Sequence, residues 1–283
     1  MVHVTRRGRV SAIVQALRII GRRVLRVFAL ALLAYLAIVW FRGEGRSALG
    51  LWLGAAVVLF ALLLGAYSAY RSWQARRESL WERAVYSPEL REKAIRQLHA
   101  KLARLTPVTH LTRSEHARVS VLLAELLDAQ VNYPAAIATI DAVDLTALSA
   151  LEVGLVRHTR AVTHLRADDA RGALMGLGKR EPTGDNELDQ RLNLLEAYAR
   201  IELGEVSWGL AEAERISLLE NVHETVVSEA RVVRAAGLDA AGRHEEALVV
   251  LTALGRDVLG PLSELGQPRA RQLALAALAS SEA

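Results

Sequence analysis

Residues 235–254 read AAGLDAAGRHEEALVVLTAL, and their pattern is that of two helices joined by a short turn. Ala235 lies in the first apolar segment, and Ala247 lies twelve positions later in the second. The turn between them, residues 241–244, is Ala-Gly-Arg-His, and glycine is typical of a helix end. Helices that cross closely need small side chains at the crossing, because a long side chain would hold the two axes apart. The stretch therefore predicts a helix–turn–helix pair.

The same pattern occurs four times along the chain. In each unit a small residue is followed by an aliphatic residue, and a second small residue lies twelve positions upstream. The small residues of the second helices are separated by 37, 36 and 38 positions. The eight small residues are Ala124 with Ala136, Ala161 with Ala173, Ala197 with Gly209, and Ala235 with Ala247. A fixed period of this length predicts a solenoid of stacked helix pairs.

Residues 115–256 resemble the tetratricopeptide repeat family. Two passages carry the resemblance best: YPAAIATIDAV, residues 133–143, and residues 235–254. The period is slightly longer than the family's usual repeat of about 34 residues. The family's characteristic Trp and Leu-Gly of the first helix are missing, and so is the terminal Pro of each unit. Related solenoids of paired helices therefore stay open as alternatives.

The resemblance implies that a partner peptide or helix binds the concave face, which the first helix of each repeat lines. Alignment of the units on their small residues gives six candidate partner-binding residues on that face. These are Arg118, Glu125, His158, Arg191, Tyr198 and Glu229. The same mixture of charges is also typical of an ordinary solvated face.

Composition and charge divide the chain into two parts. The 283 residues are 52% hydrophobic and only 5% aromatic, which favours helices over strands. Residues 1–83 contain thirteen arginines and three acids, whereas the rest contains 22 basic and 28 acidic residues. The basic pI therefore describes the N-terminal part, and no nucleic-acid partner is expected for the acidic remainder.

Two segments are predicted to cross a membrane. Residues 48–70 contain no charge over 23 positions, which exceeds the thickness of a hydrocarbon core. Residues 27–41 form a shorter uncharged run that Val24 and Leu25 extend, with Arg26 long enough to reach the headgroups. A signal-peptide core is the rival interpretation of this run, but no small-residue cleavage site follows it. We expect a helical hairpin over residues 24–70, with spans at about 24–41 and 48–70.

The arginines predict the orientation of this hairpin. Seven, including Arg26, precede the uncharged run of the first span, and four follow the second span, whereas the turn between the spans has two arginines and one glutamate. Positive charge favours the cytoplasmic side, so both termini are expected in the cytoplasm, with the protein in a bacterial inner membrane. Residues 1–23 form a basic amphipathic segment. It is interpreted either as a helix on anionic lipid or as an extension of the first span.

The sequence contains no pattern of catalytic or metal-binding residues. There is no cysteine, which excludes disulfides, thiolate metal sites and a cysteine nucleophile. His110 and His116 are six residues apart, as are His158 and His164, and six residues turn a helix by about 240°. Such pairs diverge. We therefore expect no catalytic residues, no metal, no cofactor and no enzymatic activity.

The prediction as a whole is an all-α protein: two N-terminal transmembrane helices followed by an α-solenoid of tetratricopeptide-like repeats. Residues 71–110 are expected to be a helical linker or a degenerate repeat, and residues 111–283 the repeat domain. Residues 262–280 are expected to be a capping helix, with Gly266-Gln267-Pro268 as a candidate interruption of its start. The function predicted is a membrane-anchored scaffold or adaptor that recruits a partner protein. The alternative is a role in haem biosynthesis, because the layout is similar to that of HemY-type proteins. A transporter or channel subunit is disfavoured, since the only charge in either span is Arg26, which is expected to reach the headgroups.

Overall fold

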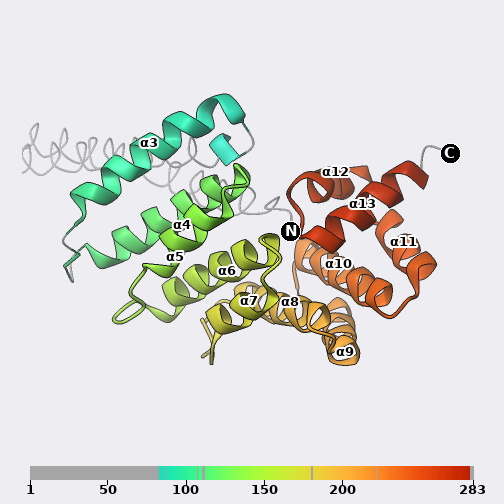
Figure 1. The fold of residues 1–283 in the computed structure, drawn as a ribbon. Helices are drawn as coiled ribbons and strands as arrows, with labels where there is room; N and C mark the ends of the chain where they lie inside the picture. Colours follow the sequence, from blue (N-terminus) through green and yellow to red (C-terminus); the bar gives the residue numbers. More distant parts are fainter. Residues whose placement is uncertain are drawn as a thin grey trace, which may run out of the picture. The chain divides into compact units, whose positions relative to one another are not determined.

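The computed structural model describes residues 83–85, 87–106, 108–109, 112–179, 181–220 and 222–280. All of these belong to one of the chain's two compact units. They form eleven helices, α3 to α13, and no β-strand (Figure 1). The prediction of an all-α fold is confirmed for this part of the chain.

Long and short helices alternate through the centre of this unit. The four long helices all have 17 residues: α4 (Arg113–Ala129), α6 (Ala150–Arg166), α8 (Asn186–Glu202) and α10 (Glu224–Ala240). The short helices are α5 (Tyr133–Asp141), α7 (Ala170–Leu177), α9 (Val206–Ser217) and α11 (His244–Thr252). They are flanked by α3 (Pro88–Arg104), α12 (Arg256–Leu265) and α13 (Pro268–Ser280).

Each long helix packs against the short helix that follows it, and the predicted small residues lie in these contacts. The seven alanines among them are fully buried, and Gly209 is buried as well. A Cβ on Gly209 would lie 2.8 Å from the backbone oxygen of Ala197, its predicted counterpart on α8. The helices therefore cross at the place where the sequence has no bulky side chain.

The pairs stack in sequence order, since each long helix contacts the next long helix and each short helix contacts the next long one. Two hydrophobic clusters result. One extends from Ala84 to Val156 and the other from Ala161 to Ala277. Every helix buries its apolar side against its neighbours, so the elements stabilise one another rather than standing alone.

Side-chain caps explain where several helices begin. Asn132, Ser149, Asp169, Asp185 and His223 each accept a hydrogen bond from a backbone N–H of the first turn. At α6 the cap is reciprocal, because the Glu152 carboxylate also accepts a bond from the Ser149 N–H at 2.9 Å. These bonds satisfy donors that have no partner within the helix.

The four turns between long and short helices share one backbone conformation. In each, a residue has a positive φ: 62° at Val131, 62° at Asp168, 93° at Gly204 and 77° at Gly242. The next residue donates its N–H to a carbonyl five positions back, as Asn132 does to Leu127 at 3.0 Å. This is the Schellman helix end, which favours glycine because a Cβ is strained there.

Val131 is a β-branched residue in that glycine position, and its replacement tests this interpretation. Its side chain is 65% exposed, so little burial is lost when it is removed. We expect Val131→Gly to raise the free energy of unfolding by about 1 kcal/mol, because relief of left-handed strain outweighs the added freedom of the unfolded chain. Chemical denaturation followed by circular dichroism measures this change. Gly204→Val is the converse variant and should lower stability; a loss of stability in Val131→Gly would contradict the argument.

The C-terminal segment, residues 262–280, is divided at Gly266 and Gln267, where the sequence indicates an interruption of the capping helix. The structure has two helices here, because the chain leaves helical conformation at Gly266 and Gln267 before Pro268 starts α13. Proline fits the first turn of a helix, where its missing N–H has no partner to lose. Helix α13 packs against α10, α11 and α12.

The predicted membrane spans, residues 24–41 and 48–70, lie outside the described residues, as does the segment 1–23. Among the residues that are described, no helix is both long enough and apolar enough to cross a bilayer.

Candidate functional site

The six predicted partner-binding residues occupy equivalent positions on the long helices. Arg118, Arg191 and Glu229 are each the sixth residue of their helix, His158 is a ninth, and Glu125 and Tyr198 are each a thirteenth. Positions six, nine and thirteen lie on one side of a helix. We call this side of α4, α6, α8 and α10, together with their last two residues, the long-helix face.

On α8 and α10 the structure brings two of the predicted residues together. Arg191 Nε lies 3.6 Å from Glu229 Oε2. The same guanidinium lies 3.0 Å from Glu187 and donates to the Thr225 hydroxyl at 3.2 Å. Burial raises the pKa of Glu229 above its usual value, and the charge of Arg191 opposes that rise. This pair joins neighbouring helices and is largely withdrawn from solvent.

Tyr198 is buried rather than presented to solvent. Its side chain is 2% exposed, and its hydroxyl accepts a hydrogen bond from the backbone N–H of Ala270 at 3.2 Å. Burial, with the nearby carboxylate of Glu202, raises the pKa of the phenol. The C-terminal helix α13 thus occupies the position that was predicted for a partner.

On α4 the predicted residues lie beside charged neighbours. Arg118 donates to Glu115 at 3.0 Å, and Glu115 also accepts a bond from Lys101 of α3. Burial opposes ionisation of Glu115, but the bonds from Lys101 and Arg118 lower its pKa below the usual value. Glu125 is partly buried, and His158 on α6 is buried.

An ion pair that the sequence did not indicate closes the end of the face. Asp128, in the last turn of α4, pairs with Arg166, the last residue of α6. Burial raises the pKa of Asp128, and the charge of Arg166 opposes the rise. Only the period of the repeat could have suggested this contact, since the two residues are 38 positions apart.

Between the charged parts of the face, α6 contributes apolar side chains. Leu151 is 43% exposed, and Leu155 is partly buried at the sixth position. Helix α6 contacts α4 on one side and α8 on the other. The face therefore offers an exposed leucine near the start of α6, a helix that lies between α4 and α8 and their charged side chains. Apolar contact with flanking charge suits the binding of a protein segment.

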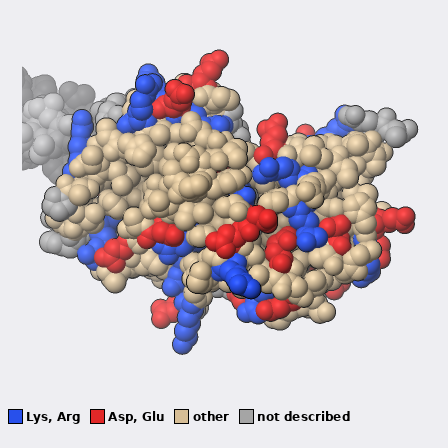
Figure 2. All heavy atoms as spheres, viewed as in Figure 1, with Lys and Arg blue, Asp and Glu red and all other residues tan. Residues whose placement is uncertain are grey.

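Charges of both signs lie side by side around a broad area without charged side chains in the left half of the visible surface (Figure 2). Figure 2 shows acidic and basic side chains next to one another on that side, with no large area of one sign. Within the described parts of the chain, no three His, Asp or Glu side chains gather as metal ligands would.

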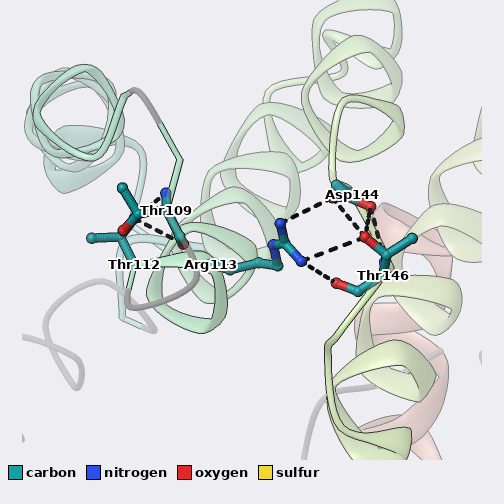
Figure 3. A network of polar contacts seen from close by, with 5 residues as sticks. All are labelled: Thr109, Thr112, Arg113, Asp144 and Thr146. Carbon is teal, nitrogen blue, oxygen red and sulfur yellow. Dashed lines mark hydrogen bonds and ion pairs between the residues drawn. The ribbon is translucent and has the colours of Figure 1, made fainter.

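A polar network holds the start of α4 against the loop that precedes α6 (Figure 3). Arg113 donates to the backbone oxygen of Thr146 at 2.9 Å and lies 3.6 Å from Asp144. Bonds from the hydroxyl and the N–H of Thr146 lower the pKa of Asp144. On the N-terminal side, the Thr109 N–H donates to the Thr112 hydroxyl at 2.9 Å. These contacts fix the starting ends of α4 and α6 relative to one another.

No family model, no curated protein and no solved structure matches this chain.

Proposed function

We propose that this protein is a membrane-anchored, tetratricopeptide-like scaffold that recruits a partner protein at the cytoplasmic face of the membrane. The observation that supports it is the stack of four equal long helices, each followed by a short one, with one face in common. Stacked helix pairs provide extended surfaces of this kind for peptides and helices. In this proposal the two predicted spans hold the stack at the membrane, which raises the local concentration of whatever it binds.

The partner-binding part of the face is proposed to centre on α6. Leu151 supplies exposed apolar area, and the charged side chains of the neighbouring helices α4 and α8 supply orientation. Binding energy in such surfaces concentrates in a few central side chains, while the charged rim contributes mainly selectivity. At the end of the face formed by α8 and α10, α13 already contacts Tyr198.

A matched pair of variants tests this proposal. The tagged full-length protein is purified in mild detergent, and the proteins that remain bound are quantified by mass spectrometry. Leu151→Glu should lower recovery of a stoichiometric partner by about tenfold or more, because a charge replaces a central apolar contact. The control is Val249→Glu, at a side chain that is 71% exposed on the short helix α11 and outside the long-helix face. Both sites are exposed, so each change should alter stability by no more than about 0.5 kcal/mol.

Equal recovery of the partner with both variants would contradict the assignment of the face. A purified wild-type protein with no stoichiometric protein partner would contradict the scaffold function itself.

A further inference from the structure

The first turn of α13 is bound by the ends of two long helices. The Arg269 guanidinium donates to both carboxylate oxygens of Glu202, at 3.0 and 3.2 Å, and to Asp239 at 2.8 Å. The next residue, Ala270, donates its N–H to the Tyr198 hydroxyl. One short segment near the C-terminus thus contacts α8 and α10 through charged and neutral hydrogen bonds together.

The two carboxylates lie where their own helices do not favour them. Glu202 is the last residue of α8, and Asp239 is the last but one of α10. The C-terminal end of a helix carries a partial negative charge, so an acid there is unfavourable. Such a pair of acids is stabilised by a cation and by the N-terminal end of another helix. Arg269 and the start of α13 supply both.

Helix α13 is held by small side chains. Its buried residues are Ala270, Leu273, Ala274 and Ala277, whereas Leu275 is 54% exposed. Helix α8 buries several large side chains: Leu188, Leu192, Leu194, Leu195, Tyr198 and Ile201. Hydrophobic stabilisation scales with the apolar area buried, so α13 is held less strongly than α8 and opens at lower cost.

We propose that Glu202, Asp239 and Tyr198 form a receptor site for the first turn of a helix that carries an arginine and an alanine-rich face. Helix α13 is the built-in occupant of this site, and a partner helix of the same chemistry replaces it. This rests on the proposed scaffold function, because it names the kind of segment that the partner presents.

A labelled synthetic peptide with the sequence of residues 266–280 tests the proposal on the full-length protein in mild detergent. Fluorescence anisotropy compares its binding to the wild type and to Arg269→Glu, in which the built-in arginine is lost. The variant should bind the peptide about tenfold more tightly than the wild type, because charge repulsion frees the site. A peptide that itself carries Arg269→Glu is the control and should not bind. Equal affinity of wild type and variant, or no binding to either, would overturn the proposal.

Hydrogen exchange of the unmodified protein gives a second test that requires no substitution. Amides of residues 269–280 should exchange about tenfold faster than those of residues 186–202, as expected for an element that opens locally. Equal protection of the two segments would refute a displaceable α13. Neither test involves the natural partner or Leu151, so a negative result in either test would not contradict the scaffold proposal. Conversely, if the scaffold proposal failed, the two tests would still show whether α13 can be displaced from its site.

Discussion

Replacement of Gly209 by leucine is expected to lower the free energy of unfolding by about 3 kcal/mol, at the upper end of the usual cost of overpacking. A Cβ at this position would lie 2.4 Å from Cγ1 of Ile201 and 2.8 Å from the backbone oxygen of Ala197. A backbone atom cannot move aside as the end of a side chain can, so α8 and α9 must separate. Chemical denaturation of the full-length protein, followed by far-UV circular dichroism, measures the loss.

Ala211→Leu is the matched control on the same helix. Ala211 is exposed two residues further along α9, so the same side chain there should change stability by no more than about 0.5 kcal/mol. Equal effects of the two leucines would contradict the close crossing on which the repeat assignment depends.

Removal of the Arg191 guanidinium between α8 and α10 is expected to have the second large effect on the free energy of unfolding. Arg191→Met should cost about 3 kcal/mol, because it leaves the carboxylate of Glu229 in a buried position without its paired charge. The side chain of Glu229 is 7% exposed. The double variant Arg191→Met with Glu229→Gln should recover most of the loss, since no buried charge then remains. A double variant as unstable as Arg191→Met would contradict this explanation.

The cost of Arg191→Met should also depend on pH. Burial holds the folded pKa of Glu229 above its ordinary value of 4.5, and Arg191 opposes that rise. An acid whose folded pKa is raised binds more protons in the folded state. The contribution of Glu229 to the free energy of unfolding is therefore fully present below pH 4.5, and it is lost as the pH rises towards the folded pKa. Without Arg191 the folded pKa rises further, so the penalty measured in denaturation curves should grow from pH 5 to pH 7.

Helix pairing could be predicted from the sequence because its signals are local. A crossing needs small side chains twelve positions apart, and Ala124 with Ala136 is such a pair in the sequence itself. The equal lengths of the four long helices follow from the same spacing. Capping residues such as Ser149 and Glu152 then mark where a helix begins. The strained backbone at Val131 could not be predicted, because valine carries no signal for a left-handed turn.

The long-range contacts of the face could not be predicted in the same way. The sequence predicts that Tyr198 contacts a partner, but α13 returns to it from 72 positions further along the chain. No periodicity encodes such a contact. The repeat spacing places Arg191 and Glu229 on one face, whereas their burial depends on how tightly adjacent long helices approach. The partner-binding role of all six residues stays a prediction.

The tethering of the repeats to the cytoplasmic side is the central claim, and cysteine labelling in intact cells tests it most directly. The chain has no cysteine of its own, so single replacements can be compared without background. Ser47→Cys lies in the predicted turn between the two spans, and Ser207→Cys is an exposed position on α9. A membrane-impermeant maleimide should label Ser47→Cys in intact cells and should label Ser207→Cys only after the cells are permeabilised. Labelling of Ser207→Cys from outside, with Ser47→Cys protected, would contradict the account.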